Sequence, residues 1–147
     1  MTHDELKRFI TEYTEEVWNQ GKVDAMSQYY AANYQHHDVS RPDVTTLADY
    51  AQWARDLQAT FAGLHVAIDD LIADPIDGKA VKRWTATGRH VAALAGIAPT
   101  GRDISFSGSS AYRLADGKIV ESWYVYDLFG LLNQLRTLPA SSETATV

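Results

Sequence analysis

Four strand patterns follow one another in the second half of the chain, and this succession constrains the fold more than any other feature. Two turn signals separate them: the sequence from Asp74 to Gly78, and Ala115-Asp116-Gly117, whose Asp-Gly pair is typical of a β-hairpin. Consecutive strands joined by short turns favour antiparallel pairing. The strand patterns cover residues 65–73, 79–90, 102–114 and 118–126.

Helical patterns lie mainly before these strands. Apolar side chains recur at helical spacing, and Gly21 supplies a stop after the first helix. A polar, turn-rich stretch with a short strand around residues 34–38 separates the second helix from the third. The expected helices cover residues 4–19, 23–32, 46–61 and 128–136.

Helices followed by consecutive strands predict an α+β fold. We expect a strongly curved antiparallel β-sheet with the N-terminal helices packed on its concave face, closed by a short C-terminal helix. Long strands twist strongly, so sheet and helices together should form a cone with an apolar interior, the usual place for a small ligand. Residues 1–136 are predicted to form a single domain, and the polar residues 137–147 a disordered tail.

Composition excludes several classes of function. The chain has 147 residues and no cysteine, so it has neither a disulfide nor a thiolate nucleophile or metal ligand. Its net charge is −6 and its basic residues are scattered, which argues against a nucleic-acid partner. No stretch is apolar enough to span a membrane, and the charged N-terminus does not resemble a secretory signal. We therefore expect a cytoplasmic protein.

Asp127 stands between an aromatic strand and a leucine-rich helix. Alternate strand residues share a face, so Trp123, Val125 and Asp127 project to one side. If that side faces the cone, burial beside Trp123 raises the pKa of the carboxyl group and makes it a candidate acid or base. The alternative is that Asp127 caps the helix beginning at Leu128, which is the more frequent role of such an aspartate.

Two further positions carry histidines that could move protons. Of His36 and His37 only one can face a pocket, because neighbouring strand residues point to opposite sides. His90 ends a strand and is a weaker candidate. A metal site formed by these histidines with Asp38 is not expected, since consecutive residues do not converge on one ion and no recognised ligand spacing occurs.

Aromatic residues supply the remaining candidates. Trp18, Trp53 and Tyr30 lie on apolar helical faces, where core packing is the favoured interpretation and contact with a substrate the other. The motifs of serine hydrolases, phosphate-binding loops and dinucleotide-binding folds are absent from the sequence. Acid–base chemistry in an apolar pocket, without cofactor or metal, is the reaction type that remains.

Four segments together resemble the SnoaL-like polyketide (ester) cyclases, of the nuclear-transport-factor-like or cystatin-like cone superfamily. The resemblance runs in order from about residue 5 to residue 136. The segments that carry it are FAGLHVAIDDLIAD, VKRWTATGRH, GIAPTGRDISFSG and YRLADGKIVESWYVYDLFGLLNQL.

The resemblance implies a cone fold, a homodimer formed through the sheet, and an intramolecular aldol ring closure on a hydrophobic polyketide ester. It implies no cofactor and no metal. The base implied is Asp127, which removes a proton next to a carbonyl, and a pocket histidine, His37 or His90, would hold the substrate carbonyls. Candidate substrate-binding residues are Trp123, His90, Tyr34, Trp53, Tyr30 and Trp18.

The sequence leaves three other interpretations open. Because relatives on the same cone include isomerases, hydrolases, dehydratases, hydroxylases and proteins that only bind, the fold does not by itself fix a reaction. The chain could be a non-catalytic module that binds a hydrophobic small molecule, or a dimeric scaffold with a filled core. A steroid-isomerase interpretation requires a second pocket carboxylate, for which Asp38 is available.

Overall fold

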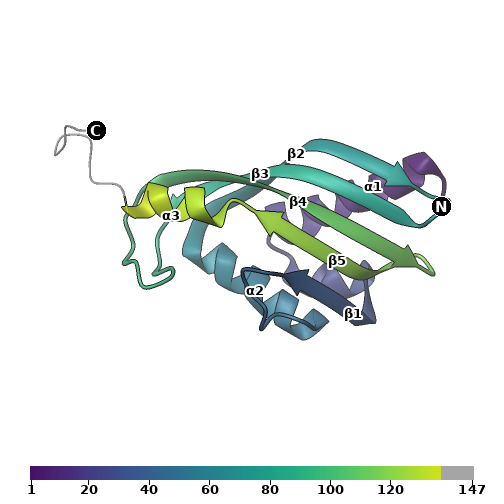
Figure 1. The fold of residues 1–147 in the computed structure, drawn as a ribbon, viewed down its shortest axis with the longest axis horizontal. Coiled ribbons are helices and arrows are strands. Elements are labelled where there is room, and N and C mark those ends of the chain that lie inside the picture. The colour runs from purple at the N-terminus through teal and green to yellow at the C-terminus, as the bar shows by residue number, and fades with distance from the viewer. Residues whose placement is uncertain (137–147) are drawn as a thin grey trace.

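A computed structural model describes residues 1–136, and the predicted tail of residues 137–147 lies outside this part of the chain. Helices and strands follow one another as the α+β prediction requires (Figure 1). In chain order the elements are α1 (His3–Tyr13), the π-helix η1 (Thr14–Asn19), the 3-10 helix η2 (Val23–Gln28), β1 (Tyr30–Asp38), α2 (Leu47–Thr60), β2 (Phe61–Asp74), β3 (Lys79–His90), β4 (Asp103–Ala115), β5 (Lys118–Tyr126) and α3 (Leu128–Arg136).

The five strands form one sheet in the order β1-β5-β4-β3-β2. Strands β2 to β5 pair antiparallel, as expected for strands joined by short turns. The first strand, β1, pairs with β5 in parallel, so the predicted antiparallel pairing is confirmed for β2 to β5 but not at this edge. The reason is the connection: α2 and three strands separate β1 from β5, which frees β1 from the geometry that a tight turn imposes.

Capping boxes fix where the two long helices begin. The hydroxyl of Thr2 accepts a hydrogen bond from the backbone of Glu5, whose carboxylate accepts one from the backbone of Thr2 in return. Thr46 and Asp49 make the same pair of bonds at the start of α2. The predicted helix over residues 4–19 is confirmed, with the last six residues in the wider π-helical form.

The predicted helix over residues 23–32 is wrong in its second half. The 3-10 helix ends at Gln28, and Tyr30 already pairs with Ile119 of the neighbouring strand. Sheet pairing and burial of the Tyr30 ring override the weak local helical pattern. The strand predicted for residues 65–73 begins four residues earlier, because β2 starts at Phe61, directly after the last residue of α2.

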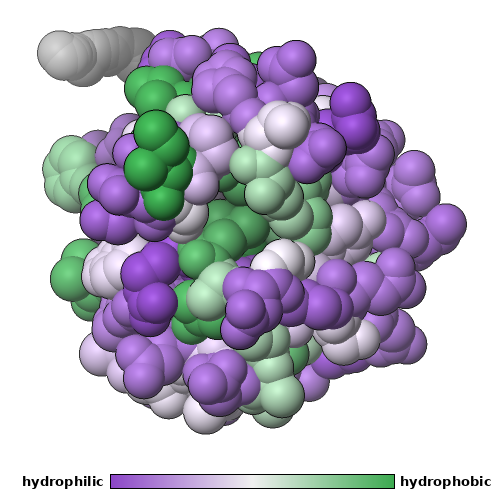
Figure 2. Space-filling model, turned by 90° about the vertical axis from the view of Figure 1, so that its right-hand side faces the viewer, coloured by the Kyte–Doolittle hydropathy of each residue, from purple (hydrophilic) through white to green (hydrophobic). Residues whose placement is uncertain are grey.

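The Asp116-Gly117 hairpin is confirmed. Both residues have positive φ angles, 51° and 74°, as the tightest hairpin turns require. This turn and the turn between β2 and β3 lie at one end of the molecule, next to the N-terminus (Figure 1). Figure 2 views that end, where mostly hydrophilic residues surround a smaller hydrophobic area. The polar groups with potential chemistry lie elsewhere, between the sheet and the helices.

The helices α1 and α2 pack on one face of the sheet and enclose the core (Figure 1). Strands β1, β3 and β5 turn alternate side chains toward these helices, so much of the core consists of residues at two-residue spacing. In the described part of the chain, no helix is long and apolar enough to cross a membrane.

Candidate active site between sheet and helices

The last strand, β5, turns its two faces toward very different surroundings. Ser122 and Tyr124 are buried beneath the helices, whereas Trp123 is 42% exposed and Val125 is 66% exposed. The prediction that Trp123, Val125 and Asp127 share a face is correct, but this face is the outer one. Because aromatic or apolar residues occupy both faces of β5, the sequence offers no hydropathy contrast that would identify the inner face.

Asp127 caps α3 on the exposed side of this junction. Its Oδ1 accepts a hydrogen bond from the backbone N–H of Gly130 at 2.9 Å, so the cap interpretation is confirmed. A Cβ at Gly130 would overlap the carboxylate, which explains the glycine inside this short helix. The structure does not bring Asp127 into a pocket walled by Trp123.

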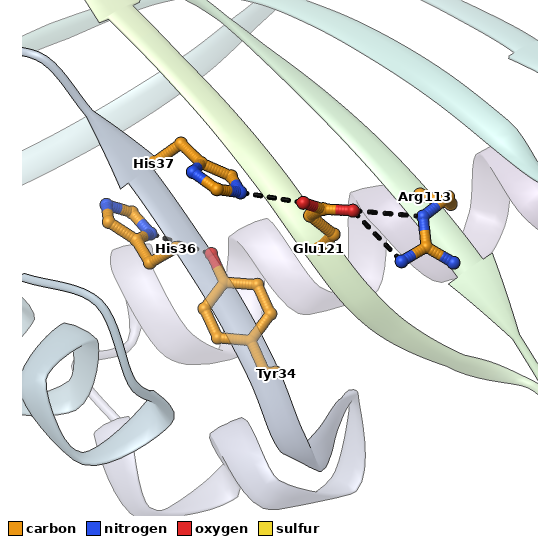
Figure 3. Close-up of polar contacts among 5 residues, drawn as sticks. All are labelled: Tyr34, His36, His37, Arg113 and Glu121. Carbon is orange, nitrogen blue, oxygen red and sulfur yellow. Dashed lines mark hydrogen bonds and ion pairs between the residues drawn. The ribbon is translucent and has the colours of Figure 1, made fainter.

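His37 also lies on the outer face. Its Nε2 is 2.7 Å from Oε2 of Glu121, and the other oxygen of Glu121 accepts hydrogen bonds from Arg113 (Figure 3). The bond to His37, followed by the bond to Arg113, lowers the pKa of Glu121. The His37 ring stacks on Trp123 with 5.3 Å between centroids. The predicted pocket histidine of this pair is therefore not His37.

His36 is the histidine of the pair that faces the interior, where it is 3% exposed. Its Nδ1 lies 2.7 Å from the hydroxyl of Tyr34 (Figure 3), and among residues 1–136 its Nε2 has no hydrogen-bond partner. Burial, and then the charge of His37, lowers the pKa of His36 to about 4. The ring is neutral at pH 7, and its unpaired Nε2 is buried among aromatic rings; His36 does not line the cavity described below.

A cluster of tyrosine hydroxyls lies beside His36. The hydroxyl of Tyr50 contacts those of Tyr13, at 2.5 Å, and of Tyr124, and Trp18 donates its indole N–H to Tyr13 at 2.9 Å. The His36 ring lies 4.5 Å from the Tyr50 ring and 4.9 Å from the Tyr124 ring, measured between centroids. Burial raises the pKa of each of these tyrosines, so they remain neutral donors.

Asp38 closes β1 on the same buried side as His36. Its Oδ1 accepts a hydrogen bond from the backbone of Ser40 at 2.8 Å. The neighbouring Tyr126 is half-buried, and burial, followed by the charge of Asp38, raises the pKa of its hydroxyl. The Tyr126 ring packs against Trp53 and Trp84, so this carboxylate stands at the margin of the aromatic interior.

His90 is fully buried but serves the loop after β3. The backbone N–H of Thr100 donates to its Nδ1 at 3.1 Å, and its backbone pairs with Arg102 and Gly101. Because Nδ1 is an acceptor, the ring proton is on Nε2, which has no partner among the described residues. His90 does not line the cavity described next.

A small apolar cavity of about 30 Å³ lies between the sheet and α2. That volume corresponds to about one water molecule, so any larger ligand requires its wall to move. Half-buried Leu57 and Leu64 form the part of the wall nearest the surface. The residues that line the cavity are Trp18, Trp53, Leu57, Leu64, Val66, Lys82, Trp84, Ala86, Phe106 and Tyr124.

The aromatic candidates divide between wall and core. Trp18 and Trp53 line the cavity and pack edge to face on one another. Tyr30 and Tyr34 do not line the cavity; they pack against each other and against Tyr50 in the core. Core packing, the favoured interpretation of Tyr30, is confirmed by this position.

Lys82, like the hydroxyl cluster of Tyr13, Tyr50 and Tyr124, is not among the site residues predicted from the sequence. It is 2% exposed, lines the cavity, and donates from Nζ to the hydroxyl of Thr14 at 2.8 Å. Burial lowers the pKa of its amine to about 7. Alternation within β3 carried the signal, because Ala80, Lys82 and Trp84 share one face, where a lysine between apolar residues is unusual.

The polar groups of this interior suit proton transfer more than metal binding. Within residues 1–136 no group of three His, Asp or Glu side chains is arranged to hold a metal ion. The interior instead combines a neutral imidazole, neutral phenols and an amine in an apolar enclosure. Such groups can donate to a carbonyl oxygen and accept a proton from the carbon beside it.

Comparison with known proteins gives the same fold and one family. The family model described as SnoaL-like polyketide cyclase matches residues 9–135. A candidate polyketide cyclase from Acidithiobacillus ferrooxidans is 30% identical, with a TM-score of 0.79, over 89% of this chain and 94% of the other. TsrD from Streptomyces laurentii is 25% identical, with a TM-score of 0.83, over 94% of this chain and 99% of the other.

A third solved structure supports the fold alone. AclR, a candidate hydroxylase from Streptomyces galilaeus, is 24% identical, with a TM-score of 0.81, over 94% of this chain and all of the other. A search of curated proteins finds no match.

Proposed function

Because the chain belongs to the SnoaL-like polyketide cyclase family, we propose that it catalyses acid–base chemistry on a hydrophobic carbonyl compound without a cofactor. The reaction is an intramolecular aldol cyclisation or a related isomerisation. The observation that carries this proposal is the position of His36, a neutral buried imidazole with an unpaired Nε2. It lies beside the hydroxyl cluster of Tyr13, Tyr50 and Tyr124, of which Tyr124 lines the cavity.

The hydroxyl cluster is suited to stabilise an enolate. The hydroxyl groups of Tyr13, Tyr50 and Tyr124 converge with the indole N–H of Trp18. Within residues 1–136, the hydrogen bonds of this cluster join its members to one another and not to a carboxylate or a carbonyl oxygen. A carbonyl oxygen that gains negative charge is a better acceptor than a phenol, so it would draw these donors toward itself. Fixed donors in a dry site lower the energy of such a charge more than water does.

His36 supplies the group that moves the proton. In the tautomer with a proton on Nδ1, the ring donates to the Tyr34 hydroxyl and leaves Nε2 as an acceptor. Nε2 removes the proton from the carbon between two carbonyl groups, and the enolate carbon then bonds to the carbon of a further carbonyl group elsewhere in the same molecule. The imidazolium returns its proton to the resulting alkoxide, so the step consumes no further reactant.

Asp127 is the base that the family resemblance implies, and it is the alternative to His36 as the group that removes the proton. Its carboxylate is exposed and anchored to Gly130, which supports a role in capping. A catalytic role requires the substrate to bind at the rim of the sheet instead of beneath the helices. Substitution at Asp127 and at His36 separates these two sites.

The proposal is tested with a panel of aromatic polyketide esters and simpler β-keto esters, monitored for ring closure or loss of the enolic proton. We expect His36→Gln to reduce turnover strongly and His37→Gln, which alters the neighbouring outer histidine, to leave it unchanged. Equal activity of both variants and the wild type would exclude His36 as the proton carrier.

One observation favours a second candidate function, a non-catalytic binding module. Most of the cavity wall is aromatic or aliphatic, which suits retention of an apolar molecule without reaction. This candidate predicts that the panel compounds bind, that none is converted, and that His36→Gln leaves their affinity unchanged. Conversion of any bound compound by the wild type, and its loss in His36→Gln, contradicts it.

Pairing of two copies through the outer sheet face belongs to the same proposal. Among the described residues, four large apolar side chains on that face are exposed, those of Ile72, Val81, Trp123 and Val125. Burying them would remove apolar surface from water, as the predicted homodimer requires. Sedimentation equilibrium of the wild type and of Val125→Lys tests this part: a dimer should become a monomer, and a monomeric wild type would contradict it.

A further inference from the structure

We propose that Lys82 is a covalent site, whose amine condenses with a carbonyl group of a small apolar ketone, aldehyde or β-dicarbonyl compound to form an imine. The site is the cavity between β3 and α2, and nothing in the proposed acid–base step uses this lysine. This proposal rests on the proposed function only for the class of ligand, a hydrophobic carbonyl compound.

The surroundings of Lys82 do not pair its charge. Its Nζ donates to Thr14, and the nearest aromatic faces are the rings of Tyr13 and Tyr112, with centroids at 5.3 and 5.7 Å. No carboxylate forms an ion pair with Lys82 within residues 1–136, and burial is what shifts its pKa. A structural lysine at such depth normally has a carboxylate partner, because a buried unpaired charge is costly.

The same surroundings prepare the amine for nucleophilic attack. With a pKa of about 7, a large fraction of the amine is uncharged at neutral pH, whereas an exposed lysine is almost fully protonated there. The titratable groups around it are phenols: Tyr13 from α1, Tyr112 from β4 and Tyr124 from β5. Burial raises the pKa of each, so none carries a charge that would hold a proton on Lys82.

The cavity places this amine where a carbonyl compound would enter. Lys82 and Tyr124 both line the cavity, and Tyr124 belongs to the hydroxyl cluster. Half-buried Leu57 and Leu64 lie on the side toward solvent, so their movement would admit a ligand to the amine.

The chemistry balances without a further reactant. The uncharged amine of Lys82 adds to the carbonyl carbon, and the oxygen takes up the proton that the nitrogen loses, giving a carbinolamine. A second proton transfer from nitrogen to oxygen, relayed by the hydroxyl of Thr14 that lies 2.8 Å from Nζ, releases water as the C–O bond breaks and C=N forms. With a β-dicarbonyl compound the imine tautomerises to an enaminone, and hydrolysis by one water restores the amine.

The test uses pentane-2,4-dione as the probe, because its enaminone persists without reduction. The full-length protein is incubated with the dione across pH 6 to 9, and adducts are assigned by intact mass and peptide mapping. We expect the fastest adduct at Lys82, with a rate that rises through about pH 7. Lys82→Met should lose that adduct, and Lys79→Met, which removes an exposed lysine of the same strand, should retain it.

Two further variants keep the result decisive. Leu57→Ala widens the entrance and should speed the reaction at Lys82 at least several-fold. His36→Gln should leave it unchanged, so loss of turnover and loss of the covalent site are distinguished. Lys82 reacting no faster than Lys79, in both the wild type and Leu57→Ala, would overturn the proposal.

Discussion

The rings of His36 and Tyr50 stack beneath the sheet, with centroids 4.5 Å apart and planes inclined by 21°. One residue further along β1, His37 stacks on Trp123 outside the sheet. Of these two adjacent histidines, His36 is therefore buried among aromatic rings and His37 is exposed to solvent. The consequences for stability and for catalysis should differ accordingly.

Acid should destabilise the protein through His36. Its pKa is about 4 in the folded state, whereas that of an ordinary histidine is 6.5, so between these limits the unfolded chain binds more protons. Stability therefore falls as the pH falls from 6.5 toward 4, by up to about 3 kcal/mol from this residue. Urea unfolding of His36→Gln across this range should show a shallower loss than the wild type and His37→Gln; identical curves for all three would contradict the burial argument.

Lys82 should make the stability of the protein depend on pH in the alkaline range, above pH 7. Its pKa is about 7 in the folded state, whereas that of an ordinary lysine is 10.5, so the unfolded chain binds more protons between these limits. Stability should rise with pH from 7 to 9.5, below the range where unfolded tyrosines ionise, by at most ~1.4 kcal/mol per pH unit.

The matched variant for this effect is Lys82→Met, which keeps the length of the side chain. It should be more stable than the wild type at pH 7, and its free energy of unfolding should change little up to pH 9.5. A wild type and variant with parallel pH profiles would show that Lys82 keeps an ordinary pKa.

Asp127 should behave as a helix cap in stability measurements. Replacement by alanine removes the acceptor for the Gly130 N–H and should cost about 1 kcal/mol, whereas asparagine retains a capping oxygen and should cost less. Thermal unfolding of Asp127→Ala and Asp127→Asn gives the comparison. Equal stability of Asp127→Ala and the wild type would exclude the cap as a source of stability.

The hydroxyl cluster should matter for rate more than for folding. Tyr124→Phe removes one donor while the ring remains, and loss of such a donor typically lowers kcat by a factor of about 100 or more. Tyr126→Phe removes a hydroxyl outside the cluster and is the control. Steady-state kinetics on any compound converted by the wild type measure the difference, and equal kcat values for the two variants would exclude the cluster from the reaction.

Local patterns were sufficient to predict most of the fold. The hairpin at Asp116-Gly117, the long strands and most of the helices follow from turn chemistry and hydrophobic spacing, which act over a few residues. Pairing of Tyr30 with Ile119 depends on strands far apart in sequence, so the local pattern at residues 23–32 was a poor guide.

The site was harder to predict because it depends on which face of a strand is buried. In β5 the alternation correctly separated Trp123 from Tyr124, yet both are aromatic and either face could be the inner one. In β1 the adjacent His36 and His37 presented the same ambiguity. Only in β3, where Lys82 interrupts a clearly apolar face, did the sequence contain a signal that could have been used.

Turnover of His36→Gln beside that of Asp127→Asn tests the central claim most directly. Glutamine can retain the hydrogen bond of His36 to Tyr34, and asparagine can retain the bond that Asp127 accepts from Gly130. Both substitutions should therefore leave the fold intact. If the reaction occurs beneath the helices, His36→Gln loses activity and Asp127→Asn retains it. Loss of activity in Asp127→Asn, with His36→Gln fully active, would contradict the account and assign the base to the rim of the sheet.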